Sequence, residues 1–392
     1  MVFRPNPTTV PHQLGRQSDM KKLFVAILFG GRSGEHEISL LSARSVLEKI
    51  DRDRFEVIEV GITQEGTWLV GKQVLKAFEE RNYSLLKPAC LIAEPGSHTI
   101  YTREKRDDHD QLRPYRKIDV IFPVLHGTFG EDGTLQGLLE LMEIAYVGAG
   151  VLGSAVGMDK ALFKHVMRAN QVPVLSDLVF SRKEIESGLE QVLDTCESLS
   201  AYPLFTKPAN LGSSVGIAKC NNREQLTEGL QDAARYDRRV MVEKGLQKPM
   251  EIEISVLGNE FPQASVPGEI VPGDDFYTYE DKYINGISHS VIPAELPPEM
   301  MDSIRDIAIR AYKAIDCAGM ARVDFLVDQD GKEIYLNELN TIPGFTQISM
   351  YSKLWEASGI SYSDLITRLI DLALDRQQER TRSLHQYRRK DA

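Results

Sequence analysis

The chain has 392 residues, of which 42% are hydrophobic and 26% charged, and its 29 glycines and 18 prolines are ordinary for a globular protein. These values exclude collagen-like and intrinsically disordered classes, and the length predicts two or three domains. A net charge of −11 provides no broad basic surface, so we expect neither nucleic acid nor a membrane as the main partner.

The first predicted domain covers residues 22–145 and has the pattern of an α/β domain with a parallel sheet. Its first apolar run is continuous, as in a strand that is covered on both faces. Strands are predicted at 23–29, 55–62 and 119–124, and helices at 37–50 and 134–143. Strands that alternate with helices are typical of parallel sheets. We expect the charged stretch 95–117 to be a surface excursion without a catalytic role.

Two further units are predicted, over residues 146–250 and 251–392. Gly148, Gly150 and Gly153 indicate a turn at the start of the second unit. The remaining strands are predicted at 203–208, 240–243, 251–257, 321–327 and 333–338, and the remaining helices at 159–169, 299–315 and 362–374.

The four cysteines, at 90, 196, 220 and 317, lie far apart and form no CxxC pair. They predict neither a zinc site built from cysteines nor a disulfide framework, so we expect reduced thiols in a cytoplasmic protein. Every apolar run is shorter than the about 20 residues of a membrane span. The polar, proline-rich residues 1–21 are expected to form a disordered leader.

The third unit contains an oxygen-rich constellation. Alternate side chains of a strand share a face, so Arg322 and Asp324 point together, as do Glu338 and Asn340. The turn-forming residues 328–331 suit a hairpin that would set the two pairs side by side. Two carboxylates, an amide and a guanidinium suit Mg²⁺ that holds phosphate oxygens. A surface ladder of ion pairs is the alternative interpretation.

A second constellation joins a lysine to a loop of glycines and serines. Lys207 lies in a predicted strand and is followed by Gly212, Ser213, Ser214 and Gly216. Backbone N–H groups of such a loop can cradle phosphate, and the lysine supplies the countercharge. The segment is not a Walker A motif, because no GK[ST] closes it. A flexible hairpin loop is the alternative.

Two glycine-rich segments, 30–37 and 126–133, follow predicted strands of the first domain, where α/β sheets place their ligands. The carboxylate of Glu35 could hold an ammonium group, although glycine-rich turns before helices are common. His126 suits either a site or a hydrogen-bonded structural role. The aromatic, charged segment 277–283 fits either a lid that excludes water or a rigid surface loop.

Together and in this order, the motifs resemble those of the D-alanine–D-alanine ligases of the ATP-grasp superfamily. The resemblance extends over residues 22–375 and is carried by GG·S·EHE·S, LHG··GEDG·LQG, the lysine before GSSVG, YEDKY, RVD and NELN·IPG. It implies an α/β fold with a three-domain ATP-grasp architecture and a parallel sheet in the N-terminal domain. ATP is then expected between the second and third domains, and the amino acids between the first and third.

The resemblance implies ATP-dependent ligation of two D-alanines, through D-alanyl phosphate, to D-alanyl-D-alanine for peptidoglycan precursors. The expected partners are ATP, two D-alanines and two Mg²⁺ or Mn²⁺ ions, in a cytoplasmic homodimer. The intact pair Lys282 and Tyr283 favours D-alanine over D-lactate as the second substrate. A D-alanine–D-lactate ligase and another ATP-grasp carboxylate–amine ligase are the alternatives. A non-enzymatic ligand-binding module would differ from all of these by lacking ATP turnover.

The resemblance also implies roles for individual residues. Glu35 is expected to hold the ammonium group of the first D-alanine, and Ser213 and Tyr283 to complete a hydrogen-bonded set with it that closes the lid. Arg322 and the N–H of Gly344 are expected to form an oxyanion hole.

The remaining roles concern binding. His126 is expected to steer the carboxylate of the first D-alanine, and Ser349 with the backbone at Met350 to receive that of the second. The residues expected to bind ATP are Lys160, Lys207, Lys282 and Ser214, with Glu243 and Glu251 at the adenine and ribose end. The residues expected to hold the metal ions are Asp324, Glu338 and Asn340.

Overall fold

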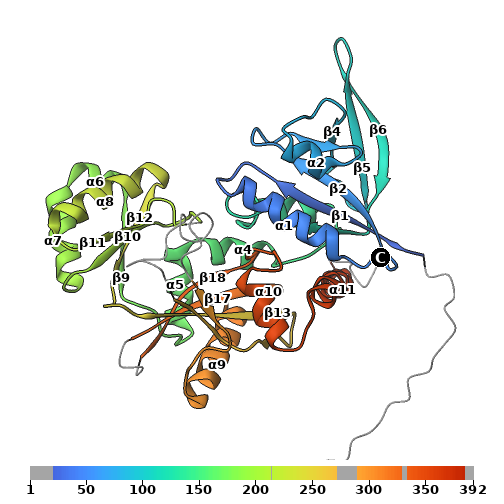
Figure 1. The fold of residues 1–392 in the computed structure, drawn as a ribbon. Coiled ribbons are helices and arrows are strands. Elements are labelled where there is room, and N and C mark those ends of the chain that lie inside the picture. Colours follow the sequence, from blue (N-terminus) through green and yellow to red (C-terminus); the bar gives the residue numbers. More distant parts are fainter. Residues whose placement is uncertain (1–20, 213, 272–288, 329–332, 385–392) are drawn as a thin grey trace, which may run out of the picture.

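The computed structural model describes residues 21–212, 214–271, 289–328 and 333–384 (Figure 1). In this part of the chain the strands form three sheets, each packed against helices. Within the same residues, no helix has the length and apolar character needed to cross a membrane.

The first sheet has a parallel centre and an antiparallel extension. Its described strands, in sheet order, are β6 (Asp110–Lys117), β5 (Thr99–Lys105), β4 (Lys87–Cys90), β3 (Trp68–Val70), β2 (Phe55–Ile62), β1 (Leu23–Gly30), β7 (Val120–Pro123) and β8 (Ala145–Tyr146). Its helices are α1 (His36–Lys49), α2 (Val74–Glu79) and α3 (Thr134–Leu141). Strand β1 pairs in parallel with β2 and β7, and β7 pairs in parallel with β8. The strands and helices predicted for this domain are confirmed.

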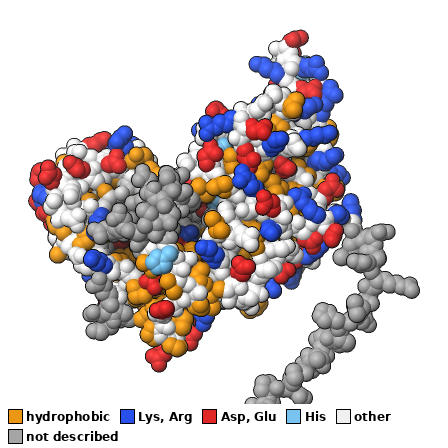
Figure 2. Space-filling model, viewed as in Figure 1, with side chains coloured by type: hydrophobic (Ala, Val, Ile, Leu, Met, Phe, Trp, Pro, Cys, Tyr) orange, Lys and Arg blue, Asp and Glu red, His pale blue; other side chains and the backbone are white. Residues whose placement is uncertain are grey.

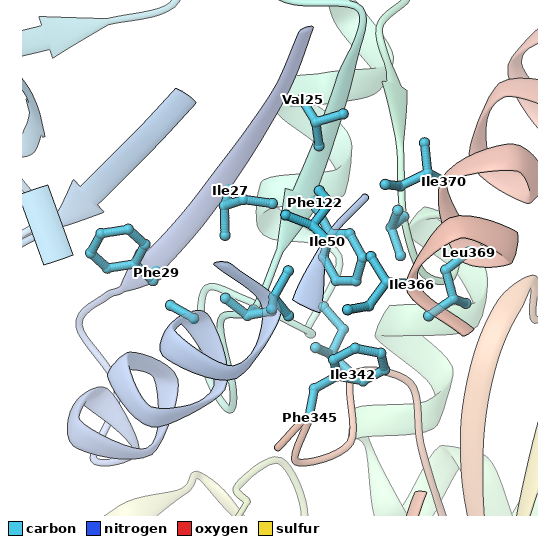
Figure 3. Close-up of a cluster of buried hydrophobic side chains, with 14 of the residues drawn as sticks. Val25, Ile27, Phe29, Ile50, Phe122, Ile342, Phe345, Ile366, Leu369 and Ile370 are labelled. Atoms are coloured by element: carbon cyan, nitrogen blue, oxygen red, sulfur yellow. The ribbon is translucent and has the colours of Figure 1, made fainter. Parts of the chain in front are cut away.

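Strand β1 is buried on both faces, as its continuous apolar run predicts. Val25, Ile27 and Phe29 share a core with α1 and with α11 (Tyr362–Thr381), whereas the alternate residues Ala26 and Leu28 share a core with α3. Figure 3 shows the side chains of α11 beside those of β1 and β7. A helix near the end of the chain therefore completes the core of the first domain.

The stretch 95–117 is a surface excursion, as predicted, but it is also ordered as strand. Strands β5 and β6 pair antiparallel and extend the sheet as a projecting hairpin (Figure 1). Most of β6 is exposed, and Figure 2 shows Lys and Arg side chains spread over the hairpin.

The second sheet is antiparallel and carries Lys207. Its described strands, in sheet order, are β11 (Ala218–Cys220), β10 (Leu204–Pro208), β12 (Arg239–Lys244) and β9 (Asp177–Ser181). The helices packed with it are α6 (Arg182–Ser187), α7 (Leu189–Leu199) and α8 (Arg223–Tyr236). The strands predicted at 203–208 and 240–243 are confirmed as β10 and β12.

The third sheet alternates core and polar residues with a period of two. Its described strands, in sheet order, are β16 (His289–Val291), β15 (Gly268–Val271), β13 (Met250–Gly258), β17 (Gly319–Val327) and β18 (Ile334–Asn340), with β14 (Gln263–Ala264) beside β13. Its neighbouring helices are α4 (Val151–Met158), α5 (Lys160–Ala169), α9 (Pro298–Ala314) and α10 (Met350–Ala357). Ile252, Ile254 and Val323 pack into a core with α9 and α5. The alternate residues Glu253 and Arg322 are thus left for the opposite face.

The predicted turn at Gly148, Gly150 and Gly153 is only partly correct. Gly148 has a φ of +100° and Gly150 precedes α4, but Gly153 lies inside that helix. A Cβ on Gly153 would lie 3.1 Å from both the carbonyl oxygen of Asp316 and the Cα of Cys317. This glycine therefore permits close packing of a helix rather than a turn.

Candidate active site

One cavity of about 770 Å³ collects the site residues that were predicted along the whole chain. Those that line it are Glu35, His126, Lys160, Lys207, Ser214, Glu243, Glu251, Arg322, Asp324, Glu338, Asn340, Gly344, Ser349 and Met350. Ser213, Lys282 and Tyr283 lie outside the described residues. Lining residues come from α1 and a loop of the first domain and from strands of the second and third sheets, so the cavity lies where the three parts of the chain meet.

Strands β17 and β18 form the predicted antiparallel pair. Arg322 lies opposite Asn340 and Asp324 opposite Glu338, and the register shifts just after Asp324. The guanidinium of Arg322 donates to both carboxylate oxygens of Asp324, at 2.7 and 2.6 Å, and lies 3.1 Å from a carboxylate oxygen of Glu253. Burial opposes its charge, but the two carboxylates raise the pKa of Arg322 above its usual range.

The predicted metal ligands are oxygen donors at one end of this strand pair. Asn340 donates to Asp324 (3.1 Å), and Glu338 lies 3.3 Å from Nζ of Lys160. Among the described residues, no three acidic, histidine or cysteine side chains are grouped to hold a metal ion. The set therefore rests on two carboxylates and one amide, and these hard oxygen donors fit Mg²⁺ or Mn²⁺.

Two lysines point into the cavity from different elements. Lys160 begins α5, a helix capped by the side chain of Asp159, and its Nζ donates to the carbonyl of Leu211 (3.1 Å). That contact ties it to the glycine–serine loop. Lys207 of β10 donates to Glu243 (2.5 Å) and approaches Asn337 (3.5 Å). Burial lowers the pKa of Lys207 to about 8.

Glu243 has a partner that the sequence did not indicate. Its buried carboxylate pairs with Lys164 of α5 as well as with Lys207. Burial lowers the pKa of Lys164 well below its usual value. The predicted contact of Glu243 with adenine or ribose stays a prediction, because its carboxylate also holds these two lysines together.

Glu35 lies at the start of α1, between two glycines. A Cβ on Gly127 would lie 2.6 Å from its Oε2, and a Cβ on Gly212 would lie 3.2 Å from the same atom. Glycine at both positions therefore gives this carboxylate room between two loops. The arrangement joins the first glycine-rich turn to the loop that follows Lys207.

His126 is 4% exposed and uses both ring nitrogens. Burial lowers its pKa, so the ring is neutral. Nδ1 lies 2.9 Å from the carbonyl oxygen of Ile342, which can only accept, so Nδ1 carries the proton and Nε2 accepts from Ser42 (2.9 Å). These bonds fit the structural role that the sequence left open, and the steering of a substrate carboxylate stays a prediction.

Gly344 and Ser349 lie together at the start of α10. A Cβ on Gly344 would be 3.3 Å from the Oγ of Ser349, which accepts the N–H of Thr346 (3.0 Å). The first N–H groups of a helix have no partner within the helix, and Met350 is the first residue of α10. The expected binding of a carboxylate by its N–H stays a prediction.

Sequence reasoning missed three charged residues: Glu131 and Glu253 line the cavity, and Lys164 pairs with the lining residue Glu243. Lys164 follows Lys160 by one helical turn, Glu253 follows Glu251 on the same strand face, and Glu131 lies within the second glycine-rich motif. The position of each residue relative to a predicted site residue or motif could have indicated it from the sequence. Burial, with the nearby carboxylate of Glu35, raises the pKa of Glu131 to about 8.

Comparisons with known proteins give matches over most of the chain. Family models described as D-ala D-ala ligase N-terminus and C-terminus match residues 24–149 and 166–371. A D-alanine–D-alanine ligase of Natranaerobius thermophilus is 48% identical over 372 residues, covering 93% of this chain and 98% of the relative. The solved D-alanine–D-alanine ligase of Coxiella burnetii has a TM-score of 0.77 at 37% identity, over 93% of this chain and 97% of the other. The VanG D-Ala:D-Ser ligase of Enterococcus faecalis has a TM-score of 0.78 at 33% identity, over 90% and 100%.

Proposed function

Because the chain belongs to the D-alanine–D-alanine ligase family, we propose that its cavity joins two D-alanines into D-alanyl-D-alanine while ATP is converted to ADP and phosphate. The observation that carries this proposal is the meeting of oxygen donors, lysines and glycine-rich loops in one cavity. The predicted α/β ATP-grasp fold is confirmed by the match to solved ligases of this family.

In the first step, the carboxylate of the first D-alanine takes the γ-phosphoryl group of ATP. A carboxylate is a poor electrophile, and the phosphate turns one of its oxygens into a good leaving group. Lys160 and Lys207 line the cavity and would neutralise the phosphates. Asp324, Glu338 and Asn340 would hold two Mg²⁺ or Mn²⁺ ions, which supply further neutralisation of phosphate oxygens.

In the second step, the amine of the second D-alanine attacks the acyl phosphate. The carbonyl oxygen gains negative charge, which Arg322 and the N–H of Gly344 would stabilise as an oxyanion hole. A C–N bond forms, the bond from carbon to the phosphate oxygen breaks, and phosphate leaves. Water would hydrolyse the same intermediate, so the reaction requires an enclosed site.

The two amino acids are placed by opposite charges. Glu35 would hold the ammonium of the first, and Ser349 with the N–H of Met350 the carboxylate of the second. Ser213, Lys282 and Tyr283 remain in this proposal as the lid and phosphate contacts implied by the family motifs.

The remaining elements of the proposal concern the setting of the reaction. We place it in the cytoplasm, where ATP is available, with the dipeptide as a peptidoglycan precursor and a homodimer as the assembly. The three domains are proposed at 22–145, 146–250 and 251–392. Neither a nucleic acid nor a membrane is proposed as a partner, in keeping with the net charge of −11.

The test is phosphate release from ATP and Mg²⁺ with D-alanine, L-alanine, or D-alanine plus D-lactate, with products separated by chromatography. We expect phosphate release that depends on D-alanine and is matched by equal amounts of D-alanyl-D-alanine. Phosphate without dipeptide would indicate another acceptor, and no turnover with any of these substrates would refute the ligase proposal.

A further inference from the structure

Glu131 links two distant parts of the cavity wall. It is 8% exposed in the loop between β7 and α3, and its carboxylate accepts two main-chain N–H groups. Gly127, in its own loop, donates to Oε1 at 2.7 Å, and Ile342 donates to Oε2 at 3.3 Å. Ile342 lies 211 residues away, in the loop between β18 and α10.

The same loop is held from the other side by two residues of the first domain. His126 donates from Nδ1 to the carbonyl of Ile342 (2.9 Å), so both polar groups of Ile342 are bound by this domain. Ser42 accepts the N–H of Phe345 at 3.3 Å. Figure 3 shows the side chains of Ile342 and Phe345 within the hydrophobic core of that domain.

Gly344 lies between these anchored residues. Its N–H has a fixed position only while Ile342 and Phe345 stay attached to the first domain, where Glu35 also lies. The carboxyl group of Glu131 offers one oxygen to each loop, Oε1 to Gly127 and Oε2 to Ile342. It is therefore the side chain that connects the site of the first amino acid with the predicted oxyanion hole.

We propose that Glu131 is a positioning residue that fixes residues 341–346, and with them the N–H of Gly344, over the carbonyl carbon of the first amino acid. This inference rests on the proposed function. It assigns Glu131 to the second step, because the lysines and metal ligands of the first step lie on other elements.

Loosening this loop slows attack by the amine and leaves the acyl phosphate to water. Water oxygen then bonds to the carbonyl carbon, the bond from carbon to the phosphate oxygen breaks, and phosphate and the original amino acid are released. Loss of the hydrogen bonds of Glu131 should thus appear as ATP turnover without dipeptide, rather than as weaker ATP binding.

The test compares Glu131→Gln with a matched control in the same loop, Asp132→Asn. The amide keeps the size of Glu131 but has a single acceptor oxygen for two N–H groups. Asp132 also accepts two main-chain N–H groups, from Phe129 (2.8 Å) and Thr134 (3.0 Å), yet both belong to its own segment. Dipeptide, phosphate and the KM for ATP are measured for each variant.

We expect Glu131→Gln to lower kcat for dipeptide about tenfold to a hundredfold, since small misplacements cost this much. It should release phosphate in excess of dipeptide at an unchanged KM for ATP, while Asp132→Asn keeps the wild-type coupling. Wild-type coupling in Glu131→Gln, or equal defects in both variants, would overturn the inference. If Glu131→Gln does not fold, Glu131→Asp decides, because its shorter side chain cannot reach both N–H groups at once: release of phosphate in excess of dipeptide supports the role of Glu131, and wild-type coupling refutes it.

The two proposals fail in different ways. A wild-type enzyme that makes no dipeptide refutes the proposed function itself. A wild-type enzyme that makes dipeptide, beside a Glu131→Gln enzyme that does so equally well, refutes only the role of Glu131.

Discussion

Glu243 is the counterion of two lysines in the buried part of the cavity. Its carboxylate holds Lys164 and Lys207, and the Lys164 and Glu243 side chains are 1% and 2% exposed. We expect Glu243→Gln to lower the free energy of unfolding by about 3–5 kcal/mol, because it leaves buried lysines without their counterion. Denaturant unfolding measures this change.

The control for that experiment is an exposed ion pair. Glu379 and Arg382 pair at 2.5 Å with side chains that are 56% and 73% exposed. Solvent screens such pairs, so Glu379→Gln is expected to change stability by no more than about 1 kcal/mol. An equal decrease in the free energy of unfolding in Glu243→Gln and Glu379→Gln would contradict a stabilising role of the buried Glu243 carboxylate.

Because Lys207 is a proposed ATP ligand, we expect it to make ATP binding depend on pH. Burial lowers its pKa to about 8, so its positive charge is present below pH 8 and is lost as pH rises through that value. Nucleotide phosphates favour the charged lysine, so affinity for ATP should fall between pH 7 and 9 and binding at pH 8 should take up protons. Calorimetry in two buffers of different ionisation enthalpy measures this uptake.

Lys207→Arg supplies the comparison, because a guanidinium stays charged throughout this range. Proton uptake at pH 8 should then disappear. Equal proton uptake in the wild type and in Lys207→Arg would show that a group other than Lys207 takes up the proton.

At the scale of elements, prediction succeeded where local pattern decides the structure. The strand predicted at 55–62 is β2 without change, and β17 pairs with β18 so that the two predicted pairs of side chains lie side by side. Helix α4 was missed because its glycines indicated a turn. The close approach of Gly153 to Asp316 depends on a segment far along the chain, which local pattern does not reveal.

Two helical glycines test this explanation. A Cβ on Gly153 would meet main-chain atoms at 3.1 Å, whereas a Cβ on Gly137 of α3 would meet nothing within 4 Å. We expect Gly153→Val to destabilise by about 1–3 kcal/mol through overpacking. Gly137→Ala should stabilise by about 0.5–1 kcal/mol, because alanine favours a helix. Thermal unfolding distinguishes these opposite signs, and a stabilised Gly153→Val protein would contradict the packing argument.

At the scale of the whole molecule, α11 connects the end of the described chain to the first domain (Figure 3). Leu369 is fully buried there. We expect Leu369→Ala to lower the free energy of unfolding by about 2–5 kcal/mol, the usual cost of a core cavity. Leu384, which is 94% exposed, provides the control, and Leu384→Ala should change stability by less than about 0.5 kcal/mol. Similar values for the two variants would contradict the role of α11 in this core.

The site was predictable as a set of residues but not as a network. Each predicted ligand lies in a motif that can be recognised on its own, such as Asp324 beside Arg322. The contacts between motifs were not predictable, because they join residues far apart in sequence. The bond from Ile342 to Glu131 depends on packing of the whole chain, and spacing within either motif carries no information about it.

In the proposed function, this cavity forms D-alanyl phosphate and passes its acyl group to a second D-alanine. The most direct measurement uses D-alanine with ¹⁸O in its carboxylate and follows the label by mass spectrometry. In the proposed reaction the carboxylate oxygen attacks phosphorus and then leaves with it, so each phosphate released with a dipeptide should carry one ¹⁸O. Dipeptide formed with unlabelled phosphate would contradict the acyl phosphate and, with it, the assigned roles of Arg322 and Gly344.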